Sequence, residues 1–224
     1  MKFDIITIFP KIFDSYFNES IIWRAQKSGK IKINKVDLRK FSADKNKKVD
    51  DRPYGGGPGM VFKIEPIIKA ILNLKPNGIK EKMILFSATG KQFNSKTASE
   101  WAKKYNRIIM IAGHYEGVDE RIKKIVKIEE ISIGPYTLTG GELPAMVVID
   151  AVSRHIPGVL GKKESLEEKR LGIGVPVYTR PEVFEWPPPG RGKRGKKYAV
   201  PKVLLSGDHK KIEEWRNKHQ KKNL

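Results

Sequence analysis

Two glycine-rich turns lie between Gly113 and Met146, with the sequences GHYEGVDER and SIGPYTLTGGELPAM. Glycine has no Cβ and accepts backbone conformations that other residues avoid, so such turns present main-chain N–H and C=O groups at close range. Loops held by a rigid scaffold also carry a large share of binding residues. The two turns therefore predict a site for a small ligand that is recognised mainly by backbone atoms.

A third glycine-rich stretch, RPYGGGPGM, runs from Arg52 to Met60. It is not a P-loop, because no Gly-Lys-Ser/Thr follows the glycines. Its glycines either let the backbone approach a base or a phosphate, or form a mobile surface loop. Tyr54 favours contact with RNA, as does the basic stretch Arg24–Lys48, in which ten Lys and Arg face two acids. Such groups usually bind backbone phosphates.

Other patterns exclude several kinds of site. The pattern G-x-G-x-x-G occurs at Gly190, Gly192 and Gly195, between a triple proline and Lys-Lys-Tyr. It lacks the strand and the helix that a dinucleotide site needs, so it is either a basic loop that contacts phosphates or a solvated insertion. The four histidines have no metal-ligand spacing and there is no cysteine, which excludes disulfides and argues against a zinc site. The absence of G-x-S-x-G argues against an α/β-hydrolase.

The balance of charge predicts a polyanionic partner. The 224 residues include 45 Lys and Arg against 25 Asp and Glu, which gives a net charge of +20 and a pI of about 9.9. A charge of this size favours nucleic acid, although a lysine-biased genome would also produce basic proteins. No apolar run approaches the ~20 residues of a membrane span, and KFDIITIF is too short for a signal segment. We expect a soluble, cytoplasmic protein.

The elements that must position the turns alternate along the chain, which predicts an α/β fold with a mostly parallel sheet. The expected strands are Phe3–Phe9, Ile31–Leu38, Met83–Phe86, Ile108–Ala112 and Ile125–Ile133. The expected helices are Ile12–Gln26, Glu65–Leu74, Ser95–Tyr105, Asp119–Lys124 and Leu143–Ile156, with a final helix from about Asp208 to Lys221.

The helix Leu143–Ile156 is apolar on more than one side, since Leu143 and Val147 share one face and Ala145 and Val148 another. Such a helix needs cover on both sides, which the core and a subunit interface would supply. The character of the chain changes at Gly158. We therefore predict an α/β domain at 1–158, a linker at 159–176 and a small second domain at 177–224.

The two turns, together with PYGGGPGM, IDAVSRHIPGVLG, YTRPEVF and LLSGDHKKIEEWR, resemble the bacterial tRNA (guanine-N(1))-methyltransferases of the TrmD type, and the motifs occur in that family's order. The resemblance covers essentially the whole chain. It implies membership of the SPOUT superfamily, in which part of the α/β domain forms a trefoil knot, a topology that general rules of chain connection would not predict. It also implies a homodimer and a mainly helical C-terminal domain that binds tRNA.

The resemblance further implies that S-adenosylmethionine binds in the knot. Most of the implied contact residues are small or would use main-chain atoms. Pro135 replaces an acidic residue that is usual in the family, which removes a charge and stiffens the turn, and Ala88 stands where a proline is common. The implied cofactor contacts are Ser87, Gly113, Tyr115, Ile133, Gly134, Pro135, Tyr136, Thr137, Leu138, Gly140, Gly141 and Pro144.

Methylation of guanine at N(1) needs a base that takes the ring proton and a cation near the O6 oxygen. By resemblance Arg154 is the cation, although an ordinary ion pair with Asp150, four residues earlier, is the alternative. The family's base is an aspartate of the linker, which this linker lacks. Glu168 is the first choice and Glu167 the second, acting across the dimer interface; otherwise both are solvated linker charges.

The implied substrate is tRNA with guanosine at position 37, which is flipped out of its stack for the reaction. The residues expected to contact RNA are Tyr54, Gly59, Glu116, Arg191, Lys193 and Arg194, with a structural salt bridge as the alternative for Glu116. The family is magnesium-assisted, but the sequence shows no metal-ligand cluster, so Mg²⁺ is left open. DNA and membranes are not expected partners. A related knotted methyltransferase with another RNA target and a non-catalytic tRNA-binding protein are the alternatives.

Overall fold

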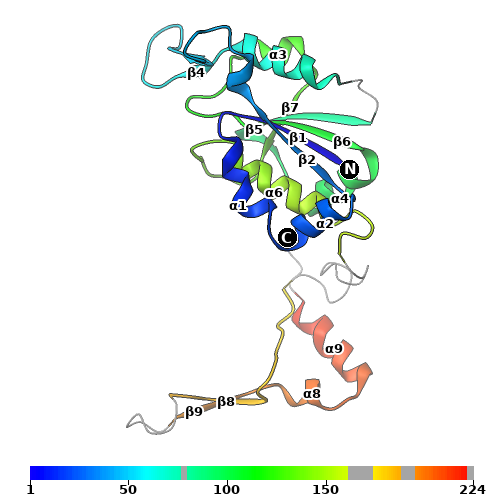
Figure 1. Ribbon diagram of the computed structural model, residues 1–224. Helices are drawn as coiled ribbons and strands as arrows, with labels where there is room; N and C mark the ends of the chain where they lie inside the picture. Colours follow the sequence, from blue (N-terminus) through cyan, green and yellow to red (C-terminus); the bar gives the residue numbers. More distant parts are fainter. Residues whose placement is uncertain (77–79, 161–173, 188–194, 221–224) are drawn as a thin grey trace. The chain divides into compact units, whose positions relative to one another are not determined.

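The computed structural model describes residues 1–76, 80–160, 174–187 and 195–220 (Figure 1). The chain divides into two compact units, Met1–Gly161 and Lys162–Leu224. The division falls inside the predicted linker, most of which lies outside the described residues.

The first unit is built on a five-stranded parallel sheet with the strand order β2-β1-β6-β5-β7. The predicted α/β fold with a mostly parallel sheet is confirmed. The central strand β6 is buried along its whole length, as a continuous apolar run indicates for a strand that is covered on both faces. The strands are β1 (Lys2–Thr7), β2 (Lys32–Asp37), β5 (Glu81–Gln92), β6 (Arg107–Ile111) and β7 (Glu129–Ser132).

Helices cover both faces of this sheet (Figure 1). Successive side chains of a strand point to opposite faces, so Ile108 and Met110 join one core with α1, α2, α4 and α6, while Ile109 and Ile111 join a second core with α3 and α5. The helices are η1 (Pro10–Phe13), α1 (Asp14–Phe17), α2 (Ser20–Lys27), η2 (Leu38–Phe41), α3 (Ile64–Leu74), α4 (Ser95–Lys104), α5 (Ile122–Ile125) and α6 (Glu142–Ser153).

Strand β5 continues well past the predicted Met83–Phe86. Its register against β7 shifts between Phe86 and Lys91, and Ile131 is paired with both of these residues. Gly90 lies directly against β7, where a Cβ would come within 2.6 Å of main-chain atoms of Glu130 and Ile131.

The predicted helix Ile12–Gln26 is wrong in its continuity, because it is divided into η1, α1 and α2. Glu19 has an extended backbone and Ser20 a left-handed φ of 51°, which interrupts the helical path. The side chain of Gln26 donates a 2.7 Å hydrogen bond to the carbonyl of Phe17, so the end of α1 is satisfied without a continuous helix.

The predicted boundary between the helix Asp119–Lys124 and the strand Ile125–Ile133 is also wrong. The Asp119 carboxylate accepts hydrogen bonds from the main chain and side chain of Arg121, which forms a turn and delays the start of α5 to Ile122. Strand β7 begins only at Glu129. Helix α6 starts directly after the Gly-Gly turn with Pro144 in its first turn, as predicted.

The described part of the second unit contains the antiparallel hairpin of β8 (Val183–Trp186) and β9 (Lys196–Ala199), followed by α8 (Lys202–Leu205) and α9 (His209–His219). The side chain of Asp208 caps α9 by accepting from the Lys211 amide at 3.2 Å. Besides the expected helices, this part of the chain therefore contains a hairpin where a basic loop was expected.

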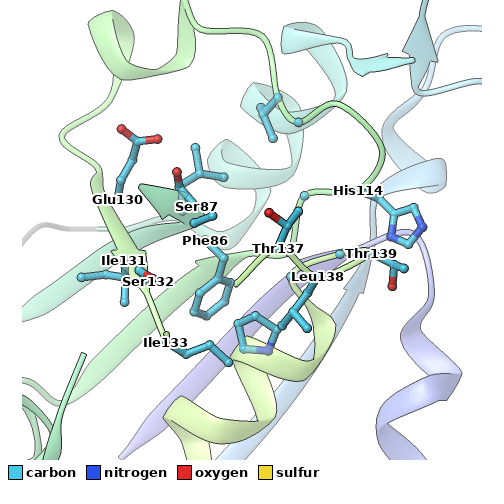
Figure 2. Close-up of a pocket in the computed structure, with 18 of the residues that line it drawn as sticks. Phe86, Ser87, His114, Glu130, Ile131, Ser132, Ile133, Thr137, Leu138 and Thr139 are labelled. Atoms are coloured by element: carbon cyan, nitrogen blue, oxygen red, sulfur yellow. The ribbon is translucent and has the colours of Figure 1, made fainter. Parts of the chain in front are cut away.

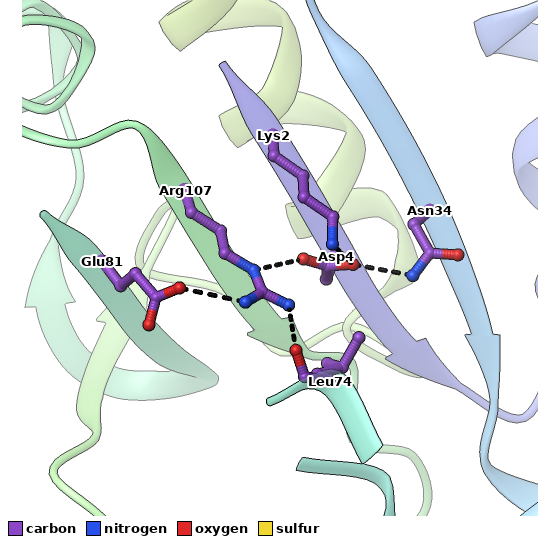
Figure 3. A network of polar contacts seen from close by, with 6 residues as sticks. All are labelled: Lys2, Asp4, Asn34, Leu74, Glu81 and Arg107. Carbon is purple, nitrogen blue, oxygen red and sulfur yellow. Dashed lines mark hydrogen bonds and ion pairs between the residues drawn. The ribbon is translucent and has the colours of Figure 1, made fainter. Parts of the chain in front are cut away.

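The amino ends of the central strands are closed by a buried polar network (Figure 3). The guanidinium of Arg107, at the start of β6, donates to Asp4 at 2.7 Å, to Glu81 at 2.9 Å and to the carbonyl of Leu74 at 2.9 Å. The fully buried Asp4 also accepts from Asn34 at 2.7 Å. Burial opposes the charge of Arg107, but the hydrogen bonds to the two carboxylates outweigh it and raise the pKa of Arg107.

Candidate cofactor and active site

A cavity of about 290 Å³ opens at the carboxyl ends of β6 and β7, next to residues 85–88 in the middle of β5 and beside the first turn of α6. Ligand sites of parallel α/β sheets are usually found at this edge. Figure 2 shows the apolar side chains of Phe86, Ile133 and Leu138 near one another, with the polar Ser87 and Thr137 close by. The predicted cofactor residues that line the cavity are Ser87, Gly113, Tyr115, Ile133, Gly134, Tyr136, Thr137, Leu138, Gly140, Gly141 and Pro144.

Pro135 is the one predicted cofactor residue that the structure does not bring to the cavity. It is exposed, whereas its neighbours Gly134 and Tyr136 line the wall. The amide of Tyr136 donates to the Gly134 carbonyl at 2.9 Å, which closes a tight turn with Pro135 at its tip. The side chain of Pro135 therefore stiffens the turn from outside.

The two glycine-rich turns contact each other through their backbones. The amide of Gly141 donates to the Gly113 carbonyl at 2.8 Å, and His114 and Gly140 form an isolated antiparallel bridge. A Cβ on Gly141 would lie 2.6 Å from the Cα of Ala112. Only glycine fits here, because the obstacle is main chain that cannot rotate away.

Gly134 is enclosed in a similar way. The Ser132 hydroxyl donates to the Gly134 carbonyl at 2.9 Å and accepts from its amide at 3.2 Å. A Cβ on Gly134 would overlap the ring of Tyr136. The second turn is thus held in one shape by local hydrogen bonds and leaves no room for a side chain on its inner surface.

A buried carboxylate joins the two turns to the sheet. Glu142, the first residue of α6, accepts a 3.0 Å hydrogen bond from the Thr7 hydroxyl. Its other oxygen lies 3.6 Å from Nδ1 of His114. A Cβ on Gly140 would overlap both His114 and Glu142. The spacing of the histidines does not reveal this trio, because it bears only on metal sites; the position of His114 inside the motif GHYEG was the available signal.

The rim of the cavity is charged. Lys123 pairs with Glu120 at 2.7 Å and with Glu130 at 2.9 Å, and all three residues line the cavity. The hydrogen bonds to the two carboxylates raise the pKa of Lys123. Nearby, a hydrogen bond from Arg121 lowers the pKa of Asp119. The segment from 119 to 123 is therefore held by ion pairs in addition to the buried side chain of Ile122.

The glycine-rich stretch Arg52–Met60 lies against the same site. The Glu116 amide donates to the Met60 carbonyl at 3.1 Å, and a Cβ on Gly59 would come within 2.5 Å of the Glu116 side chain. Glu116 lines the cavity, and Tyr54 is fully exposed at the tip of the stretch. The strands β3 (Asp50–Asp51) and β4 (Val61–Phe62) form a short ribbon at its base.

Arg154 caps the carboxyl end of α6, is half-buried and does not line the cavity of its own chain. Its proposed alternative partner, Asp150, accepts a 2.6 Å hydrogen bond from the hydroxyl of Tyr16. This hydrogen bond, together with burial and the charge of Asp150, raises the pKa of Tyr16 to about 12.

The remaining predicted residues lie outside the described part of the chain: Glu167, Glu168, Arg191, Lys193 and Arg194. Within the described ranges, no group of three or more His, Cys, Asp or Glu could hold a metal ion. No helix in these ranges is long and apolar enough to cross a membrane.

The parallel sheet and its glycine-walled cavity define an α/β protein with a candidate site for a small ligand at the carboxyl edge. A family model described as tRNA (guanine-1)-methyltransferase TrmD matches residues 1–224, and the chain belongs to this family. It is 48% identical over 221 residues to the tRNA (guanine-N(1)-)-methyltransferase of Carboxydothermus hydrogenoformans, covering 97% of this chain and 82% of that one. The protein of the same name from Dictyoglomus turgidum is 49% identical over 221 residues, with 97% and 84% covered. That from Moorella thermoacetica is 47% identical over 221 residues, with 96% and 84% covered.

Proposed function

We propose that this protein transfers a methyl group from S-adenosylmethionine to N(1) of guanosine at position 37 of tRNA. One observation carries the proposal. The predicted cofactor residues are scattered from Ser87 to Pro144, yet all except Pro135 line one cavity, in a chain of the TrmD family.

The walls of the cavity suit S-adenosylmethionine. Phe86, Ile133 and Leu138 offer an apolar wall for the adenine ring, and Gly134 and Gly140, which carry no side chain, line the approach to it. The tight enclosure of these glycines explains why no side chain blocks that approach. When bound, S-adenosylmethionine supplies a methyl group that is activated by its positively charged sulfur.

This chain's residues then move one proton and stabilise one charge. The N(1)–H bond of guanine breaks, its electron pair forms the bond to the methyl carbon, and the proton passes to the carboxylate of Glu168, or of Glu167. Negative charge develops on O6 as the proton leaves. The Arg154 guanidinium stabilises that charge, and Glu116 holds the guanine edge.

Arg154 does not line the cavity of its own chain, and a homodimer would bring it to the cavity of the second chain. With a rise of 1.5 Å per residue, α6 separates Pro144 from Arg154 by about 15 Å along its axis. On the same helix Leu143 and Val147 are 55% and 45% exposed, although the helix is otherwise strongly buried. A second copy that covers this face would place one chain's Arg154 beside the other chain's cavity.

The trefoil knot and the role of the second unit belong to the same proposal. Along the chain β7 follows β6, but in the sheet β5 lies between them, and after β7 the chain returns to Gly113 through Gly141. Such a path of the chain supports a trefoil knot.

We assign tRNA binding to the C-terminal domain, with Arg191, Lys193 and Arg194 on phosphates and Tyr54 and Gly59 near the guanine.

Mg²⁺ is left without an assigned step, because the described residues offer no cluster that could hold it. A tRNA substrate also implies a cytoplasmic location.

The decisive experiment incubates the protein with labelled S-adenosylmethionine and two tRNA transcripts that carry guanosine or adenosine at position 37. We expect label only in the guanosine transcript. Label in both transcripts would indicate another target, and binding without label would indicate a non-catalytic module. Either result overturns the proposal.

Variants then test the roles. We expect Arg154→Ala and Glu168→Gln to abolish transfer while cofactor binding, measured by calorimetry, is retained. If Glu168→Gln stays active and Glu167→Gln does not, the base is Glu167. Mixing Arg154→Ala with Glu168→Gln chains should restore no activity, since both residues of one chain act at the partner's cavity and each site of the mixed dimer therefore lacks one of them.

A further inference from the structure

The hairpin of β8 and β9 carries an unusual face. Trp186 is paired with Lys196 and Phe184 with Tyr198. Because side chains alternate between the two faces of a ribbon, these four residues project from the same face. We call Phe184, Trp186, Lys196 and Tyr198 the aromatic face of the hairpin.

Ring contacts bear out this placement. The rings of Phe184 and Trp186 are nearly parallel, with centroids 6.4 Å apart and an interplanar angle of 14°. The ammonium of Lys196 lies 5.6 Å from the centroid of Tyr198. Despite these contacts the three aromatic side chains are 52–55% exposed. The hairpin therefore offers flat apolar surfaces to solvent, with a cation among them.

This combination favours one class of ligand. Unpaired nucleotides bind to proteins by stacking their bases on aromatic side chains while lysine or arginine contacts the phosphates. Lys196 lies on the aromatic face and Lys197 beside it on the same strand, and both are exposed. A partner protein with an apolar surface would leave these lysines unpaired, whereas the phosphates of RNA complement them.

The opposite face of the hairpin lacks this character. Val183, Glu185, Lys197 and Ala199 project from it, and the side chain of Glu185 packs so closely against Gly195 that a Cβ there would lie 2.5 Å away. The aromatic side chains of the hairpin are thus confined to one face. Val183, which is 46% exposed, provides a matched control for substitutions on the aromatic face.

We infer that the aromatic face of the β8–β9 hairpin is a second RNA-binding site, which stacks unpaired bases of the substrate and holds their phosphates through Lys196. The inference deepens the proposed function, since it names a contact for single-stranded nucleotides of the tRNA outside the methyl-transfer cavity.

The test uses the full-length protein and a fluorescein-labelled RNA octamer of mixed, non-self-complementary sequence, with binding followed by anisotropy. Trp186→Leu and Phe184→Leu keep apolar bulk but remove the ring, and each should weaken octamer binding about tenfold. Trp186→Phe keeps a ring and should bind within about twofold of the unaltered protein. The control Val183→Ala should leave the affinity unchanged.

Salt dependence separates stacking from charge. Lys196→Gln should reduce the slope of log K against log salt by about 0.7, the value for one phosphate of a single strand. Trp186→Leu should lower affinity at every salt concentration without changing that slope. An RNA duplex of equal length should compete poorly, because its bases are already stacked.

Equal octamer binding by Trp186→Leu and the unaltered protein would overturn the inference. So would ring variants that alter only self-association in sedimentation, or a duplex that binds as well as the single strand. Circular dichroism and cofactor binding verify that each variant is folded. Octamer binding needs no methyl transfer, so ring-dependent binding by a protein that fails the methylation assay would sustain this inference and remove only the proposed function.

Discussion

The two ends of the parallel sheet are built in opposite ways. At the amino ends, the guanidinium of Arg107 has a partner for each nitrogen, and Asp4 is fully buried among its donors (Figure 3). At the carboxyl ends the walls are glycine turns, and Nδ1 of His114 is buried with no hydrogen-bond partner among the described residues. One end satisfies the charges of Arg107 and Asp4 within the fold, and the other leaves a buried polar atom without a partner beside the cavity. Changes at the first end should therefore affect unfolding, and changes at the second should affect binding.

The largest effect is expected at the amino ends. Arg107→Met leaves the buried Asp4 without its main cation and should lower the free energy of unfolding by about 3–5 kcal/mol in urea titrations. Lys2→Met removes a partly exposed partner 3.3 Å from Asp4 and should cost less than about 1 kcal/mol. If folded Arg107→Met lost affinity for the cofactor, the division between stability at the amino ends and binding at the carboxyl ends would be contradicted.

At the carboxyl ends, Gly141→Ala should have the next largest effect. Its Cβ would meet main chain at 2.6 Å, so the two turns must separate, and we expect about a hundredfold loss of affinity for S-adenosylmethionine by calorimetry. In Gly113→Ala the Cβ would meet only a methyl group of the Val118 side chain at 3.1 Å, rather than main chain at 2.6 Å, so its loss should be smaller. Intact affinity in Gly141→Ala would contradict the assignment of the cavity.

A smaller effect is expected for Glu142→Gln. The amide keeps its size and its bond to Thr7, but it loses the negative charge near His114. The Gly140 turn should then be less well fixed, and cofactor affinity should fall about tenfold with little change in unfolding. Glu65→Gln, which removes an exposed ion pair with Lys69, is the matched control and should change neither quantity.

The smallest effect is expected for the hydrogen bond between Tyr16 and Asp150, which should stop stabilising the fold at alkaline pH. The pKa of Tyr16 is raised to about 12, above the value of about 10 for an unfolded chain. The hydrogen bond to Asp150 therefore stabilises the fold fully below pH 10, and this contribution disappears as the pH rises toward 12. Since Tyr16 is 43% exposed, Tyr16→Phe should cost only about 1 kcal/mol at pH 8. A difference from the unaltered protein that persists near pH 12 would contradict this account.

The sequence predicted the strands of the sheet, and residues that line one cavity, better than it predicted the connections between elements. Apolar runs such as Ile108–Ile111 are informative, because strands buried on both faces typically consist of near-continuous apolar residues. The interruption between α1 and α2 at Glu19 and Ser20 could not be predicted from apolar periodicity. It depends on the side chain of Gln26, which donates a hydrogen bond to the carbonyl of Phe17 in place of a helical one.

The candidate site shows the same limit. Glycines mark the cavity because close backbone approach excludes every other residue. The pairing of Thr7 with Glu142 leaves no local pattern, since the two residues are 135 positions apart. The aromatic side chains of β8 and β9 escaped notice because their shared face depends on the strand register.

That long separation between Thr7 and Glu142 bears on synthesis of the chain. During translation Thr7 emerges early and must wait for α6 before its hydroxyl finds the carboxylate, and Gly113 must wait for Gly141. Contacts between such distant positions form late, because closing long loops is entropically costly. A nascent chain that ends before Glu142 would hold most of a sheet and no binding site. The wall of the cavity that Gly141 and Pro144 supply therefore cannot be completed until this part of the chain has been synthesised.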